Sequence, residues 1–198
     1  MGRHTSIIGI TGKISTGKDT VSKIIRSEYN FQEINVDKIG HIALKLKQDK
    51  IVKTFGSEIL NNQNEIERAK LRNIVFKDKK KLEKLEAITH PIIYKEVEQA
   101  ILKSTPNKII INAALLFKLN LAKFCGYIFI IKANDEIIKK RLKLNRNIDE
   151  NLTINMLKWQ ENIFLKKNIL NSKIINIINN KNYECLKKEI RIKMKGVI

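Results

Sequence analysis

Cysteine, proline and glycine are scarce in this chain of 198 residues, which has 2 Cys, 2 Pro and 8 Gly. Cys125 and Cys185 stand far apart, which excludes a disulfide framework and a cysteine-rich zinc site. With 43% hydrophobic residues, the composition also excludes a collagen-like repeat and a disordered chain. No apolar run approaches the roughly 20 residues of a membrane-spanning helix. Residues 1–4 lack the apolar stretch of a signal peptide, so we expect a cytoplasmic protein without a membrane partner.

Acidic residues are few as well, with 20 Asp and Glu against 39 Lys and Arg, for a formal net charge of +19. The basic residues are 32 Lys and only 7 Arg, and the chain also holds 36 Ile and 21 Asn, so the bias runs through the whole sequence. A dedicated nucleic-acid surface more often concentrates Arg. Lysine runs such as 79–81 and 139–140 fit solvated helix faces. The charge therefore predicts an affinity for anions, and we expect no specific nucleic-acid partner.

Strand-like and helix-like segments alternate, which favours an α/β fold with a parallel sheet. Apolar and β-branched runs predict strands at 6–11, 31–37, 108–113, 127–132 and 173–178. Helical patterns flank them at 19–28 and 183–193.

About 70 residues between the second and third strands are mostly helical in pattern, too many for a simple crossover. They predict helices at 66–76, 80–89 and 91–102, with Pro91 in a first helical turn. A second helical excursion covers 135–170. We expect a single domain with a core at about 1–37, 107–142 and 171–198, a helical subdomain at about 38–106 and a lid at about 143–170.

The strongest motif directly follows the first predicted strand and opens the first helix. Gly12 and Gly17 lie five residues apart and Lys18 comes next, as in loops that cradle phosphate. Glycines allow the backbone N–H groups to point into one concavity, and the helix N-terminus and Lys18 add positive charge. The predicted ATP-binding residues are Gly12, Lys13, Ile14, Ser15, Thr16, Gly17, Lys18, Asp19 and Thr20.

One position departs from the usual loop, because Asp19 stands where a Ser or Thr normally offers its hydroxyl to Mg²⁺. The Asp19 carboxylate can hold the metal or its water shell, and Thr20 can supply a hydroxyl instead. Alternatively, Asp19 only caps the helix and interacts with its dipole. Both interpretations stay open.

Further short motifs follow the loop in a fixed order: Asn35-Val36-Asp37, Arg68 to Arg72 with Phe76, His90-Pro91, Leu115-Leu116-Phe117, Arg141 and Gln160. In order and spacing they resemble the dephospho-CoA kinase family, which phosphorylates the ribose 3′-hydroxyl of dephospho-CoA in the last step of coenzyme A biosynthesis. The resemblance implies a three-layer P-loop kinase fold with a five-stranded parallel sheet, a helical substrate-binding subdomain and a lid. It also implies ATP and dephospho-CoA as substrates and Mg²⁺ as cofactor. Separately, we expect a monomer or weak homo-oligomer.

The resemblance assigns roles to individual residues. Lys18 and Arg141 would stabilise charge on the transferred phosphoryl group, and Asp37 would accept the proton of the attacking hydroxyl. Arg68 and Arg72 lie one helical turn apart and would bind substrate phosphates, unless they form a solvated helix face. His90 would contact the substrate or simply cap a helix, and Asp37 has the alternative of a strand-end turn residue.

The chain also departs from the family pattern. Asn112, Ala114 and Lys118 stand where the family usually has Asp, Pro and Glu, and Asn145 replaces the second arginine of the lid, with Arg146 displaced by one. These changes leave the metal and base details open and are compatible with reduced activity. Two other functions remain: a P-loop kinase for a nucleoside or nucleotide, and a nucleic-acid-binding protein with a vestigial loop.

Overall fold

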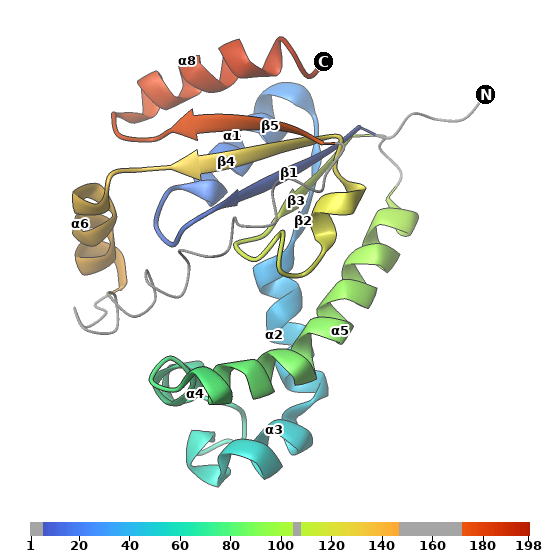
Figure 1. Ribbon diagram of the computed structural model, residues 1–198, viewed down its shortest axis with the longest axis vertical. Coiled ribbons are helices and arrows are strands. Elements are labelled where there is room, and N and C mark those ends of the chain that lie inside the picture. The colour runs from blue at the N-terminus through green and yellow to red at the C-terminus, as the bar shows by residue number, and fades with distance from the viewer. Residues whose placement is uncertain (1–5, 105–107, 147–171) are drawn as a thin grey trace.

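Five parallel strands form the centre of the molecule in the order β2-β3-β1-β4-β5 (Figure 1). The computed structural model describes residues 6–104, 108–146 and 172–198. The strands are β1 (Ser6–Gly12), β2 (Gln32–Asn35), β3 (Lys108–Asn112), β4 (Tyr127–Lys132) and β5 (Lys173–Ile178). The predicted five-stranded parallel sheet is therefore confirmed.

Helices cover both faces of the sheet and produce three layers. Helices α1 (Lys18–Tyr29) and α8 (Tyr183–Met194) pack on one face, where they meet Ile110 of β3. Helices α2 (Val36–Leu46) and α5 (Lys79–Lys103) and the 3₁₀ helix η2 (Leu121–Phe124) pack on the other face, against Ile109 and Ile111. Because side chains alternate along a strand, a strand covered on both faces is an unbroken apolar run.

The remaining helices lie beside the carboxyl edge of the sheet (Figure 1). Helix α3 (Gln48–Phe55), the 3₁₀ helix η1 (Ser57–Ile59) and α4 (Arg68–Val75) share a second apolar core with part of α5. Helix α6 (Asp135–Arg146) follows β4. Most of the predicted lid lies outside the described residues, as does Gln160. No helix within the described ranges is long and apolar enough to cross a membrane.

The prediction of separate helices at 80–89 and 91–102 is wrong, because α5 runs from Lys79 to Lys103 with Pro91 inside it. Asp78 caps its start by accepting from the backbone N–H of Lys80 at 2.8 Å. Proline removes one backbone hydrogen bond and bends a helix without necessarily ending it. Ile88 and Val97 are buried on either side of Pro91 and stabilise both halves of α5. The helix changes direction along its length (Figure 1). His90 therefore lies in a helix interior, and its capping role is wrong.

The second predicted strand, 31–37, is too long. Strand β2 ends at Asn35, whose side-chain oxygen accepts from the backbone N–H of Lys38 at 3.1 Å and caps α2. Asp37 consequently lies in the first turn of α2 instead of at a strand end.

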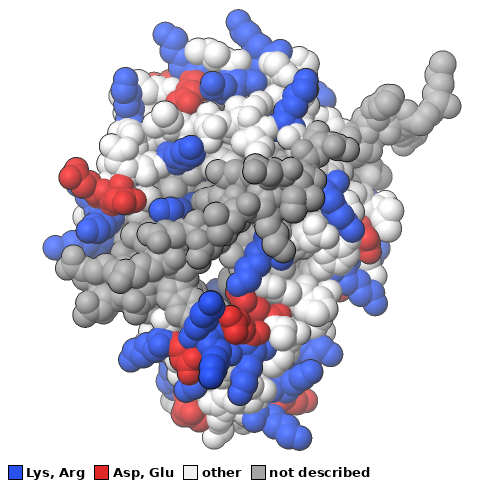
Figure 2. Space-filling model, in the orientation of Figure 1, with Lys and Arg blue, Asp and Glu red and all other residues white. Residues whose placement is uncertain are grey.

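Charged side chains of the described residues are dispersed over the face of the molecule shown in Figure 2. Figure 2 shows Lys and Arg spread over the sheet part and the helical part of one face, with Asp and Glu among them. A nucleic-acid surface typically gathers basic side chains into one patch or stripe. The described residues visible on this face show no such concentration.

Candidate active site

The predicted phosphate loop joins β1 to α1 in a conformation that needs its two glycines. A Cβ on Gly12 would lie 2.4 Å from the backbone oxygen of Ile131. Gly17 has a φ of +97°, and a Cβ there would lie 2.3 Å from Nδ2 of Asn179. Thr16 closes the loop, since its hydroxyl donates to the Lys13 carbonyl at 2.8 Å. Glycine is therefore required at both positions because neighbouring atoms lie too close for a Cβ. At Gly17 the positive φ is a second reason.

A cleft of about 510 Å³, here called the loop cleft, opens beside this segment. Lys18 lines it, and Nζ of Lys18 donates to the Lys13 carbonyl at 3.4 Å. Of the predicted loop residues, Gly12, Lys13 and Thr16 shape the loop without lining the cleft. The lining residues are Ile14, Ser15, Gly17, Lys18, Asp19, Thr20, Asp37, Ala114, Arg141, Asn179, Lys181, Tyr183 and Leu186.

Arg141 reaches the loop from α6. Its guanidinium donates to the carbonyl of Ser15 at 3.3 Å and to that of Asn179 at 3.1 Å. The amide of Asn179, only 6% exposed, donates to the Thr16 carbonyl at 2.8 Å. Arg141 and Asn179 therefore fasten the loop, α6 and the end of β5 together. This brings the guanidinium to the same cleft as Lys18.

A second cleft of about 430 Å³, here called the helical cleft, lies between α2, α4, α5 and the segment after β3. Its walls are mostly apolar, and they also contain the predicted substrate residues Arg68, Arg72 and His90. Asp37 and Ala114 line both clefts. The predicted base thus lies where the two clefts meet.

The polar groups of the helical cleft are unevenly paired. Arg72 Nε is the one buried side-chain nitrogen or oxygen in the described part of the chain without a hydrogen-bond partner. Arg68 contacts the imidazole of His41. Burial lowers the pKa of His41, Arg68 lowers it further and Asp37 opposes the shift. An unpartnered guanidinium nitrogen beside an open cleft favours an anionic ligand.

His90 and Glu86 line the helical cleft, and Lys118 lies next to them outside it. Burial lowers the pKa of His90, while Glu86 raises it and Lys118 lowers it. Lys118 Nζ contacts both carboxylate oxygens of Glu86 at 2.6 Å. Lys118, which stands where the family usually has Glu, therefore forms an ion pair with Glu86 of α5.

The loop cleft offers hard oxygen donors to a cation, because the Asp19 carboxylate and the Thr20 hydroxyl both line it. No group of three or more His, Cys, Asp or Glu side chains is placed to hold a metal within the described ranges. Mg²⁺ that binds with substrate phosphates needs only one or two carboxylates. The donor set therefore fits Mg²⁺ bound together with a nucleotide.

Sequence comparison identifies the chain's relatives. The family model for dephospho-CoA kinase matches residues 6–182. A dephospho-CoA kinase from Borreliella burgdorferi is 55% identical over 199 residues, which cover 100% of this chain and 97% of the relative. The chain belongs to the dephospho-CoA kinase family. Members of this family use ATP to phosphorylate a hydroxyl group, so the chain is a kinase with ATP as co-substrate.

Solved structures agree with this family on the fold. A Thermus thermophilus protein, TT1252, superposes with a TM-score of 0.77 at 21% identity, covering 98% of this chain and 99% of that one. A dephospho-CoA kinase from Campylobacter jejuni gives a TM-score of 0.58 at 24% identity, covering 97% of each chain. The predicted resemblance and the P-loop kinase fold are confirmed.

Sequence reasoning missed several residues of this dephospho-CoA kinase family site. Asn179 and Lys181 line the loop cleft, and His41 lines the helical cleft. A signal existed for Asn179, because it directly follows β5, and ligands of parallel α/β sheets bind beyond the carboxyl ends of the strands. No sequence pattern pointed to His41, because it lies in α2 and the bounds of that helix were not predicted.

Proposed function

We propose that this dephospho-CoA kinase family member transfers the γ-phosphoryl group of ATP to the ribose 3′-hydroxyl of dephospho-CoA, producing CoA and ADP. The observation that carries the proposal is the meeting of two different clefts at Asp37. One cleft is built around a phosphate loop, and the other is apolar with two arginines. A kinase needs this arrangement because donor phosphate and acceptor hydroxyl must be held in line.

The donor occupies the loop cleft. Backbone N–H groups of the loop and the N-terminus of α1 hold the phosphates, as helix N-termini do in other P-loop proteins. Lys18 and Arg141 lie on this cleft and stabilise negative charge on the transferred group. Arg141 does so from its anchored position against the Ser15 carbonyl.

The acceptor occupies the helical cleft. Dephospho-CoA combines a long, weakly polar pantetheine arm with a diphosphate, and the cleft combines apolar walls with Arg68 and Arg72. A diphosphate oxygen gives Arg72 Nε the acceptor that it lacks in the free protein. His90, which lines the same cleft, contacts the acceptor.

Asp37 acts on the proton of the acceptor. The ribose 3′-oxygen forms a bond to the γ-phosphorus, the bond from that phosphorus to the oxygen bridging to the β-phosphate breaks, and ADP leaves. The proton of the hydroxyl passes to the Asp37 carboxylate, which returns it to solvent. Asp19 or Thr20 would hold Mg²⁺, which would supply charge neutralisation at the phosphates when bound.

Three further features stay predictions: a cytoplasmic location, a monomer or weak homo-oligomer, and the division into core, helical subdomain and lid.

The test is turnover of the purified chain with Mg-ATP and dephospho-CoA, with the phosphorylated position located by ³¹P and ¹H NMR. We expect CoA phosphorylated at the ribose 3′ position, and no turnover by Lys18→Ala. A panel of nucleosides and nucleotides run in parallel tests the acceptor. Efficient phosphorylation of one of these, with dephospho-CoA untouched, would show that the acceptor is wrong.

A further inference from the structure

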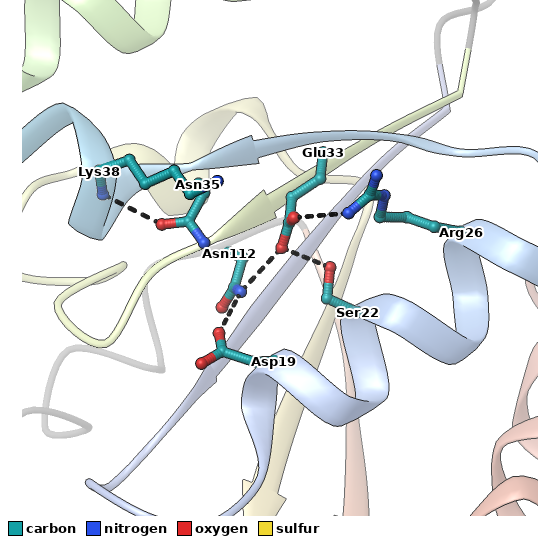
Figure 3. Close-up of polar contacts among 7 residues, drawn as sticks. All are labelled: Asp19, Ser22, Arg26, Glu33, Asn35, Lys38 and Asn112. Carbon is teal, nitrogen blue, oxygen red and sulfur yellow. Dashed lines mark hydrogen bonds and ion pairs between the residues drawn. The ribbon is translucent and has the colours of Figure 1, made fainter.

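A hydrogen-bonded bridge of side chains connects Asp19 of the loop cleft to Asn112 and Glu33, two residues to which no role has been assigned (Figure 3). Asn112 ends β3 and is paired in register with Ile10 of β1 and Asn35 of β2. Its side-chain nitrogen donates to Oδ1 of Asp19 at 2.8 Å and to Oε1 of Glu33 at 2.9 Å. One amide group thus joins two carboxylates from different elements.

Glu33 is the fixed end of this bridge. Its side chain is only 14% exposed, and it accepts from three donors. Besides Asn112, these are the hydroxyl of Ser22 at 2.6 Å and the guanidinium of Arg26 at 3.1 Å. A mostly buried carboxylate with three donors from α1 and β3 is held in one place.

Asn112 is the connecting group. It is 3% exposed, and both N–H donors of its amide nitrogen are directed to carboxylate oxygens. The opposite amide orientation would place a carbonyl oxygen against two carboxylates, so the chemistry of the neighbours fixes the orientation. A carboxylate at this position would have no donor to offer and would add a third negative charge.

Asp19 is the free end of the bridge. It is exposed in the first turn of α1 and lines the loop cleft beside Lys18. Asn112 binds one of its carboxylate oxygens, and the other oxygen points away from Asn112 (Figure 3). An exposed aspartate normally samples several rotamers, and a hydrogen bond from a buried amide selects one of them.

We propose that Asn112, anchored by Glu33, is a positioning residue that holds the Asp19 carboxylate for the metal–nucleotide complex. This inference rests on the proposed function, since it takes Mg-ATP as the occupant of the loop cleft. Asn112 touches neither nucleotide nor metal and acts only through Asp19. We therefore expect Asn112 to strengthen the coupling between Mg²⁺ binding and ATP binding.

The experiment measures the affinity for a non-hydrolysable ATP analogue by calorimetry, in EDTA and in Mg²⁺. The ratio of the two affinities is the Mg²⁺ gain. We expect Asn112→Leu, of similar size and without donors, to lower this gain about tenfold, the value of one hydrogen bond to a charged group. Affinity in EDTA should change by less than about twofold.

A double-mutant cycle separates positioning from a structural role. Asp19→Asn should lower the gain by itself, and Asn112→Leu should add nothing in that background because its effect passes through Asp19. Asn35→Ala is the matched control, because Asn35 also ends a strand but its side chain bonds to the Lys38 N–H. It should leave the gain unchanged.

Several outcomes overturn the inference: an unchanged gain in Asn112→Leu, an equal loss of affinity in EDTA and in Mg²⁺, or a full additional loss in the Asp19→Asn background. A wild-type protein without any Mg²⁺ gain overturns it too. Asn112→Ala serves in the same cycle if Asn112→Leu does not fold. A wild type that shows the gain but does not phosphorylate dephospho-CoA would contradict the proposed function alone.

Discussion

The two clefts that meet at Asp37 are built in different ways. The loop cleft depends on backbone conformation within one short segment, where Gly12 and Gly17 leave no room for a side chain. The helical cleft depends on side chains that come from three helices and from the segment after β3. A backbone site tolerates few substitutions but binds a feature common to many substrates. A side-chain site is easily altered and determines which acceptor is used.

The largest effect is expected at the junction of the clefts. Asp37→Asn removes the proposed proton acceptor and should lower kcat by about 10²–10⁴-fold, the usual contribution of a general base. The affinities for ATP and dephospho-CoA should change little, since the amide keeps the shape of the carboxylate. Steady-state kinetics and calorimetry check both. Asp49→Asn, in the first turn of α3 and away from both clefts, is the control. Full activity of Asp37→Asn would remove Asp37 as the base.

The next effect is specific to the loop cleft. Gly17→Ala forces a side chain into a φ of +97° and against Asn179. Such strain costs about 1–3 kcal/mol, and the loop can relieve it by leaving the phosphate-binding conformation, so ATP affinity should fall by about tenfold or more. Calorimetry with dephospho-CoA alone should show an unchanged acceptor affinity. Gly126→Ala is the control, since a Cβ there meets nothing within 4 Å. Equal weakening of both ligands by Gly17→Ala would mean that the clefts are not separable.

In the helical cleft, one substitution is expected to stabilise the free protein and at the same time to weaken binding of the acceptor. Arg72→Met removes a guanidinium whose Nε is buried without a partner, so it should stabilise the free protein by about 1 kcal/mol. It should also raise the KM for dephospho-CoA about tenfold by removing a charged donor. Arg68→Met should raise the KM without the gain in stability, because Arg68 contacts His41. Thermal unfolding and kinetics measure the two effects. A lower Tm for Arg72→Met would contradict the assignment.

The smallest effect concerns pH. Burial lowers the pKa of His90 below its ordinary 6.5, so the unfolded chain binds more protons than the folded one as the pH falls through 6.5. Folding stability contributed by neutral His90 is therefore present above that pH and is lost below it. The slope from one such group is at most about 1.4 kcal/mol per pH unit. Urea unfolding between pH 7.5 and 5.5 should show a shallower decline for His90→Gln. An identical decline would mean that other groups dominate.

The sequence predicted the loop cleft better than the helical cleft for a physical reason. Five apolar runs and one glycine-rich turn are local patterns, so the sheet and the phosphate loop could be located before any contact was known. The continuity of α5 through Pro91 depends on burial of both halves, which is a tertiary effect. The early end of β2 depends on one capping bond from Asn35. The bridge through Asn112 joins residues up to 93 positions apart and has no local pattern.

The start of α2 has a mechanical consequence. The helix carries Asp37 in its first turn, and Gly40, His41 and Leu44 of the same helix line the helical cleft. A helix moves as a rigid rod, so any displacement of these walls shifts Asp37 by a corresponding amount. Asp37, the proposed base, is therefore linked through one helix to the walls of the cleft that we propose for the acceptor. In the proposed mechanism, seating of the acceptor and alignment of Asp37 are thus one event, which would limit hydrolysis of ATP when the acceptor is absent.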